Sequence, residues 1–338
     1  MDKKTVNAYI ASSVKDGGIY RYILNTGDGS LTYCDRINVP APSYMQIYKN
    51  KMYIVLSNPF EGIKESGMIK CDINADGSFG RLDLTETIST QGTSGCHIAV
   101  FEENVYVANY STGSLIKINN GNSKLVTHSG KGPNADRQER AHVHHVVFTP
   151  DNKYLCATDL GIDAIIMYDH DLNYVGQAAV PAGCGPRHIV FSPCGKYVYC
   201  VNELGNSVTS LTYDGETLQA CETISILPNG YKDGGTAAAI RVSNDGKFVY
   251  ASNRGHNSIA CCKADGVKLE IIDIVSCGGK WPRDFNLTPD NKFIFCTNEH
   301  ENTVTSFKRD EATGKIRQFE QTLDIPAPLC VIFEQFSI

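Results

Sequence analysis

The feature that most constrains the fold is an internal repeat. FTPDNKYLCATDLGIDAIIMY from Phe148 is followed by similar segments from Phe191, Arg241 and Leu287. Each combines an apolar stretch, a turn rich in Pro, Asp, Asn or Gly, an aromatic and β-branched run, a second polar turn and a third alternating run, which predicts strand, hairpin, strand, loop and strand. Repeats of roughly 40 to 50 residues are typical of stacked supersecondary units, so the chain is expected to be a repeating β structure.

More divergent copies extend the series to seven. The residue four positions before the aromatic of each first strand serves as an anchor, and the anchors are Tyr44, His97, His144, Arg187, Ala238, Arg283 and Leu329. The last copy has room for only one strand, whereas VNAYIASS and GGIYRYIL near the N-terminus are strands without a first member. The two ends should therefore complete one sheet and close a ring without exposed edges. We predict an all-β, seven-bladed β-propeller with four antiparallel strands per blade, as a single domain over residues 1–338.

Composition narrows the partners and the compartment. Lysine and arginine number 31 against 37 aspartates and glutamates, giving a net charge of −6 without a basic tract, so nucleic acid is not an expected partner. The N-terminus lacks the apolar core of a signal peptide, and no apolar run approaches the roughly 18 residues of a membrane span. The thirteen cysteines are odd in number and include no CxxC pair, which predicts mostly free thiols and no thiolate zinc site. We expect a cytoplasmic protein that is not bound to a membrane.

Charged residues recur at matching places in the repeats. In a propeller, the start of the first strand and the end of the second share one rim of the central channel. That rim should carry a concave site of mixed charge for a polar small molecule. The alternative is structural, since such charges can form an ion-pair network between blades, and short polar side chains often satisfy turn backbone. The expected rim residues are His97, His144, Arg187, Glu203, Arg254 and Arg283, and the second strands end in Asn109, Asp159, Asn202, Asn253 and Asn298.

A long polar segment, THSGKGPNADRQERAHVHHVVF, precedes the third anchor. Its Gly and Pro residues predict a loop that reaches over the same rim. The H-x-H pair of His142 and His144 would point to one face of an extended strand. A metal site is disfavoured because no third ligand stands at a set spacing, so a catalytic or substrate-orienting use is expected.

These motifs resemble the seven-bladed propeller lactonase family, which includes bacterial 6-phosphogluconolactonases of the propeller type and fungal carboxymuconate cyclases. The resemblance covers essentially the whole chain and is carried by GKGPNADRQERAHVHHVVFTPD, CGPRHIVFSPCGKYVYCVNEL, VYASNRG and PRDFNLTPDNKFIF. Ala141 departs from the family's usual proline, and His145 replaces a residue that is commonly small. The resemblance implies hydrolysis of a sugar lactone, foremost 6-phospho-D-glucono-1,5-lactone to 6-phosphogluconate in the pentose phosphate pathway. It implies the catalytic residues His144, Arg187, Glu203 and Arg254.

Lactone hydrolysis needs an activated water, a stabilised oxyanion and a proton for the leaving alkoxide. In our hypothesis Arg187 or Arg254 polarises the carbonyl, and His144 or Glu203 activates the water. Two guanidinium groups beside Glu203 should lower its pKa and make it a weak base, which favours His144 with an unperturbed pKa of about 6.5. The absence of a G-x-S-x-G motif disfavours serine-esterase chemistry.

The expected ligand is an anionic sugar lactone, with no cofactor and no metal. A phosphate would be met by Arg283, Lys280 or His188, and arginine is preferred for its bidentate geometry. Three other readings remain open: a carboxymuconate cyclase, a non-catalytic interaction platform and a metal-dependent sugar lactonase. Oligomeric state is left open. The full set of expected substrate-binding residues is His97, His142, His188, Asn253 and Arg283.

Overall fold

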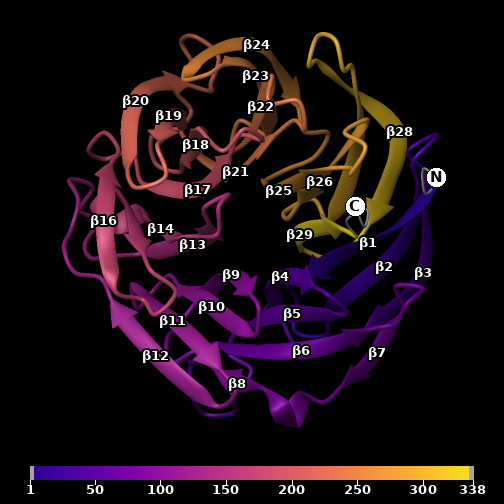
Figure 1. Ribbon diagram of the computed structural model, residues 1–338. Coiled ribbons are helices and arrows are strands. Elements are labelled where there is room, and N and C mark those ends of the chain that lie inside the picture. The colour runs from indigo at the N-terminus through magenta and orange to yellow at the C-terminus, as the bar shows by residue number, and fades with distance from the viewer. Residues whose placement is uncertain (1–3, 335–338) are drawn as a thin grey trace.

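Seven twisted sheets surround a central channel in the computed structural model, which describes residues 4–334 (Figure 1). Every sheet is antiparallel, as alternating apolar and polar runs joined by short turns favour. From the channel outward, the blades are β29 (Pro328–Phe333), β1 (Thr5–Ser12), β2 (Gly18–Asn25) and β3 (Leu31–Ile37); β4 (Pro42–Tyr48), β5 (Lys51–Leu56), β6 (Gly67–Ile73) and β7 (Phe79–Leu82); β9 (Gly95–Phe101), β10 (Asn104–Asn109), β11 (Ser114–Asn119) and β12 (Asn122–Thr127); β13 (Val143–Phe148), β14 (Leu155–Asp159), β15 (Ala164–Tyr168) and β16 (Tyr174–Ala179); β17 (Pro186–Phe191), β18 (Tyr197–Asn202), β19 (Ser207–Tyr213) and β20 (Leu218–Ser225); β21 (Thr236–Val242), β22 (Phe248–Arg254), β23 (Ser258–Asp265) and β24 (Lys268–Ser276); and β25 (Pro282–Leu287), β26 (Phe293–Asn298), β27 (Thr303–Arg309) and β28 (Ile316–Asp324).

Few elements depart from this plan. The short strand β8 (Ile88–Ser89) also pairs with β6, so one blade carries a small fifth strand. The helical elements of the described chain are two single 3₁₀ turns, η1 (Leu84–Glu86) and η2 (Leu160–Ile162). Within residues 4–334, no helix is long and apolar enough to cross a membrane.

The predicted closure of the ring is confirmed. Strand β29 pairs antiparallel with β1, so the C-terminal strand is the innermost member of a blade whose other three strands come from the N-terminus (Figure 1). Ile10 of β1 lies opposite Val331 of β29, and both are fully buried in one cluster with Phe295 of the preceding blade. All seven anchors lie on innermost strands, as the repeat predicted.

Each innermost strand carries a β-bulge close to its start, where one extra residue interrupts the pairing with the second strand. Bulges redirect side chains and are frequent beside active sites. In blade β21–β24 the irregularity falls across Ala238 and Ala239. The bulged residues of the other six blades are Ser43, Cys96, His144, Arg187, Arg283 and Leu329. The bulge therefore coincides with the anchor in most blades, but it lies one residue before the anchors Tyr44 and His97.

Truncation of Ile10 tests the closing blade. Ile10→Ala leaves a cavity between β1 and β29 and is expected to lower the free energy of unfolding by about 2–5 kcal/mol, measured by denaturant titration. Val175→Ala, at a 40% exposed position of β16, is the control and should change stability by no more than about 0.5 kcal/mol. Equal effects of the two substitutions would contradict the packing described for the closure.

Candidate active site

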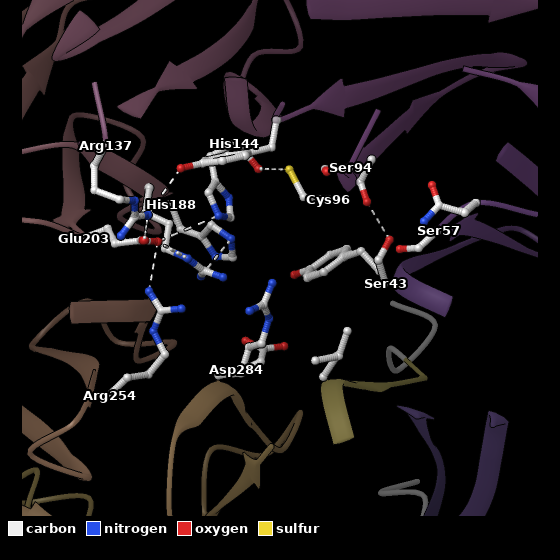
Figure 2. A pocket seen from close by; sticks show the side chains of 17 residues that line it. Ser43, Ser57, Ser94, Cys96, Arg137, His144, His188, Glu203, Arg254 and Asp284 are labelled. Atoms are coloured by element: carbon white, nitrogen blue, oxygen red, sulfur yellow. Dashed lines mark hydrogen bonds and ion pairs between the residues drawn. The ribbon is translucent and has the colours of Figure 1, made fainter. Parts of the chain in front are cut away.

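A cavity of about 440 Å³ opens at the channel end where the bulged residues lie (Figure 2). Six of the bulged side chains line it, together with residues that follow the ends of second strands, such as Glu203 and Arg254. The shared rim predicted from the repeat is therefore present. The lining residues are Ser43, Tyr44, Ser57, Asn58, Ser94, Gly95, Cys96, Tyr110, Arg137, His144, Arg187, His188, Glu203, Arg254, Arg283, Asp284 and Leu329.

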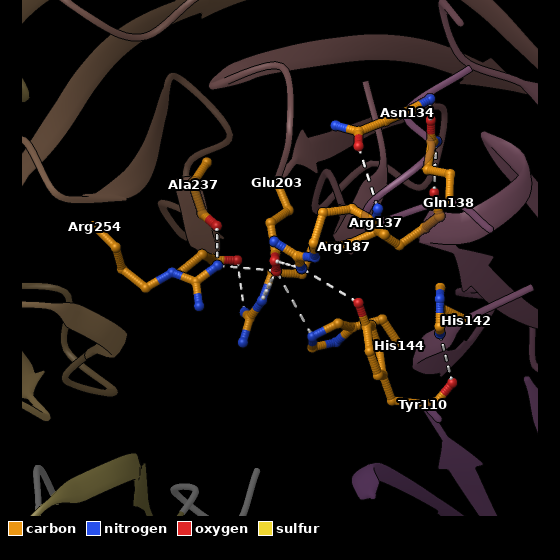
Figure 3. A network of polar contacts seen from close by, with 12 residues as sticks. Tyr110, Asn134, Arg137, Gln138, His142, His144, Arg187, Glu203, Ala237 and Arg254 are labelled. Atoms are coloured by element: carbon orange, nitrogen blue, oxygen red, sulfur yellow. Dashed lines mark hydrogen bonds and ion pairs between the residues drawn. The ribbon is translucent and has the colours of Figure 1, made fainter. Parts of the chain in front are cut away.

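Glu203 lies at the centre of the charged group (Figure 3). Its Oε1 accepts a hydrogen bond from Arg137 Nη2 at 2.5 Å, and its Oε2 lies 2.9 Å from Arg254 Nη2 and 3.1 Å from Arg187 Nε. His144 Nε2 is 3.9 Å from the same Oε2. Burial raises the pKa of the Glu203 carboxyl, but the surrounding cations outweigh it and hold the pKa well below its ordinary value. Glu203 is therefore an ionised anchor for arginines and a weak base.

Arg137 was not identified from the sequence as a site residue. The loop between β12 and β13, predicted to reach over the rim, delivers it to Glu203 and to the Tyr110 hydroxyl, which accepts a hydrogen bond at 3.2 Å. Two further contacts fix the loop: fully buried Gln138 donates to the Leu160 carbonyl, and the Asn134 side chain accepts from the Arg137 amide (Figure 3). Because the loop is outside the repeat, no other blade offers a counterpart that would have marked Arg137.

The two other arginines on Glu203 are held by the neighbouring blade. Arg187 Nη1 donates to the Ala238 carbonyl at 2.7 Å, and Arg254 Nη2 donates to the Ala237 carbonyl at 2.9 Å. Trp281, the single tryptophan of the chain, lies with its ring centroid 5.4 Å from the Arg254 guanidinium carbon. These contacts fix both guanidinium groups along one side of the cavity, where they can donate to an oxygen atom of a ligand.

A layer of four rings, which we call the channel floor, lies beneath the charged group. Its members are Tyr44, His97, His145 and His188, with centroid separations of 4.1 Å, 3.9 Å and 4.6 Å along the series. Burial lowers the pKa of His145 to about 3 and those of His97 and His188 well below the usual range. The floor is therefore uncharged at neutral pH. Despite these histidines, no three His, Cys, Asp or Glu groups of residues 4–334 converge to hold a metal.

His144 differs from its sequence-based expectation. Burial, followed by the charge of Arg187, holds its pKa well below the usual range, although Glu203 acts in the opposite direction. The imidazole is therefore neutral and does not titrate near neutrality, because it shares a buried site with several guanidinium groups. Its position on the cavity wall agrees with the sequence analysis, whereas the basicity assumed for it does not.

The expected substrate-binding residues are divided. His188 and Arg283 line the cavity, whereas His97, His142 and Asn253 do not. His97 follows the bulged Cys96, so its ring enters the channel floor and borders a second cavity on the other side. His142 precedes the bulge of β13, stacks on Tyr110 at 4.4 Å and contacts Glu139. Asn253 is fully buried and donates to the Ile226 carbonyl at 2.8 Å, so it satisfies backbone at a strand end.

The opposite side of the cavity carries hydroxyl groups. Figure 2 shows Ser43, Ser57 and Ser94 facing the group formed by Glu203 and its arginines. Arg283 Nη1 is 3.5 Å from Glu299 Oε2 with a side chain that is 31% exposed, so it is held less tightly than the arginines on Glu203. Lys280, also considered for a phosphate, pairs with Glu301 on the surface and does not line the cavity.

Comparison with known proteins bears on this site. The family model described as "Lactonase, 7-bladed beta-propeller" matches residues 7–333. A 6-phosphogluconolactonase of Bacillus subtilis is 34% identical, over 96% of this chain and 97% of the relative. A solved protein from Lactobacillus plantarum is 32% identical with a TM-score of 0.88, covering 98% of this chain and 100% of its own. The periplasmic gluconolactonase of Pseudomonas aeruginosa, 24% identical with a TM-score of 0.87 over 97% and 99% of the two chains, shares the fold.

Removing the charge of Glu203 should destabilise the protein in a pH-dependent way. Glu203→Gln leaves three guanidinium groups together without their carboxylate, which is expected to cost about 3–5 kcal/mol of unfolding free energy at neutral pH. Because the folded-state pKa is lowered, this contribution is present above the unfolded-state value of about 4.3 and is lost as the pH falls toward the folded-state value. The difference between wild type and variant in urea titrations should therefore shrink at acidic pH. Glu222→Gln, at an exposed position of β20, should show neither effect.

Proposed function

This chain belongs to the seven-bladed β-propeller lactonase family, and from that premise we propose that it hydrolyses 6-phospho-D-glucono-1,5-lactone to 6-phosphogluconate, a step of the pentose phosphate pathway. The observation that carries the proposal is the charge of the cavity. Four arginines line it against two carboxylates, Glu203 and Asp284, while its histidines are neutral. A concave site with this cationic excess favours an anionic ligand. The name of the B. subtilis relative supports the same substrate.

The charged side of the cavity suits the reacting carbonyl. Attack of water on a lactone places negative charge on the carbonyl oxygen, and fixed cationic donors stabilise that charge without having to reorganise. Arg187 and Arg254 are such donors, because Glu203 and the carbonyls of Ala237 and Ala238 already hold them in place. We assign them to the oxyanion, and we assign Glu203 and Arg137 to holding this arrangement.

The remainder of the substrate would then extend toward Arg283 and the serine side. Hydroxyl groups of Ser43, Ser57 and Ser94 can exchange hydrogen bonds with a polyol. Arg283 offers a charged, partly free fork to a phosphate, and arginine binds phosphate bidentately. His188 lies on the floor with a lowered pKa and is neutral, so it is a weaker phosphate partner than Arg283.

The proposed cytoplasmic location is supported by the cysteines. All thirteen are free in the structure, and the buried ones, such as Cys156 and Cys200, pack inside strands. Free thiols in this number suit a reducing compartment.

Turnover of the phosphorylated lactone is the direct test. Purified protein should accelerate hydrolysis of 6-phosphogluconolactone beyond its spontaneous opening and prefer it to unphosphorylated gluconolactone, measured as kcat/KM by acid release. Carboxymuconate serves as the comparison substrate for the cyclase reaction. Activity on carboxymuconate alone would overturn the proposal, and inactivity on every lactone would favour an interaction platform.

Arg283→Gln tests phosphate recognition. The variant is expected to raise KM for the phosphorylated lactone by about 10-fold or more, since a charge-assisted hydrogen bond contributes roughly 1.5–3 kcal/mol, with little change for gluconolactone. Lys280→Gln is the matched control, because Lys280 lies outside the cavity, and it should leave both substrates unaffected. Binding of 6-phosphogluconate can be followed by Trp281 fluorescence through its contact with Arg254. An equal loss on both substrates would assign Arg283 a role other than phosphate recognition.

A further inference from the structure

The group that activates water is not explained by the residues already assigned. Both oxygens of Glu203 are occupied by arginines, and its pKa is lowered. His144 is neutral, but burial and Arg187 make it a poor proton acceptor. A general base works best when its pKa lies near the working pH, and both groups are shifted away from it. If the protein is a lactonase as proposed, another proton acceptor is required.

Asp284 is the second carboxyl group of the cavity wall. It follows the bulged Arg283 on β25, is 2% exposed, and lies between the charged side and the serine side in Figure 2. Its backbone is fixed by Thr297, whose hydroxyl accepts from the Asp284 amide and donates to its carbonyl. The carboxyl group is thus placed at the base of the cavity by the sheet itself.

The two oxygens of this carboxyl group differ. Oδ1 accepts a hydrogen bond from Arg241 Nη2 at 2.8 Å, whereas Oδ2 is buried and has no hydrogen-bond partner among residues 4–334. A buried acceptor left without a partner is costly, and such groups in native structures commonly have a functional role. Glu203, by contrast, has a cation on each oxygen. Asp284 is therefore the cavity carboxylate with an oxygen available to a ligand or water.

We propose that Asp284 is the general base of the site, with Oδ2 accepting a proton from the attacking water. The water oxygen bonds to the lactone carbonyl carbon, and Arg187 and Arg254 stabilise the oxyanion. When the bond between that carbon and the ring oxygen breaks, protonated Asp284 returns the proton to the ring oxygen, which becomes a hydroxyl. The carboxylic acid formed then loses its proton to solvent, so one water is consumed and a hydroxy-carboxylate and one proton are released.

The surroundings of Asp284 suit this role. Burial raises its pKa above the ordinary value, and this outweighs the opposite effect of Arg241 and Arg187. The carboxyl is therefore more basic than Glu203 while remaining ionised enough near neutrality to accept a proton. The titratable and charged groups that influence it come from every strand packed around it, namely Arg241 of β21, Arg187 of β17, Tyr44 of β4, Cys296 of β26 and Cys330 of β29.

Asp284→Asn is the first test, because it keeps the size and the acceptor oxygen for Arg241 but removes the base. Loss of a general base typically costs about 10²–10⁴-fold, so kcat should fall by that factor with KM nearly unchanged. In the wild type, kcat/KM should fall as the pH drops through the pKa of Asp284, since the ionised form is active. This acidic limb should be absent from the variant.

A double variant separates catalysis from charge balance. If Asp284 merely neutralises Arg241, then Asp284→Asn combined with Arg241→Gln should recover most of the activity lost in the single variant. If Asp284 is the base, the double variant stays as slow as Asp284→Asn. Unfolding titrations on both variants show whether they are folded. Full activity of folded Asp284→Asn, or recovery in the double variant, would falsify the proposal.

A measurement without substrate keeps this proposal independent of the proposed function. The Asp284 carboxyl carbon can be assigned by difference between ¹³C spectra of wild type and Asp284→Asn and followed against pH. Titration above the ordinary range of aspartate supports the proposal, and titration at or below that range overturns it. A wild type inactive on all lactones would refute the proposed function alone, and the titration would still decide whether Asp284 is a base.

Discussion

A single extra residue at the start of each innermost strand is the constraint on which the site depends. A regular strand would send successive side chains alternately to opposite faces of the blade. The bulge breaks that alternation and brings two consecutive residues of a blade to the channel, as with Arg283 and Asp284 on the cavity wall. Repeated around the ring, this produces an upper layer that includes His144, Arg187 and Arg283, above a floor of rings. The chemistry of the site comes from substitutions at these repeated positions.

The charged layer is stable only as a set. Glu203 among three arginines is an ion cluster in which removing one member leaves the others uncompensated, and burial makes that loss expensive. The neutral floor has a related role. A protonated histidine beside Arg187 would add another cation to a site already in excess, and burial together with that repulsion keeps the floor uncharged. Positive charge is thereby concentrated on the arginines at the cavity side, where a ligand can reach it.

The fold was predictable because propeller blades repeat, and a repeat reveals strand order even where individual copies diverge. The same alignment found His144, Arg187, Glu203 and Arg254, which stand at places where other blades carry different residue types. It failed where one residue mattered. At His97 the extra residue is the preceding Cys96, and an offset of one moves a side chain from the wall to the floor.

Two other residues escaped the sequence analysis for different physical reasons. Arg137 belongs to a loop outside the repeat, so only its tertiary contact with Glu203 identifies it. Asp284 follows Arg283 and would point away from the site in a regular strand, and the bulge is what brings it to the wall. Its significance further depends on which of its oxygens is paired, a detail that no sequence pattern encodes.

The arrangement around the cavity also limits how a substrate can lie in it. The oxygen that becomes negative during attack must be close to Arg187 and Arg254, because no other arginines of the described wall are fixed on Glu203 from the neighbouring blade. A polyol chain is disfavoured there, since its hydroxyls would compete for donors without contributing charge. It is better accommodated near Ser43, Ser57 and Ser94, with Arg283 available to a terminal anion. In this orientation Asp284 lies between the two sides, next to the part of the ring where the bond is broken, which is where proton transfer must occur.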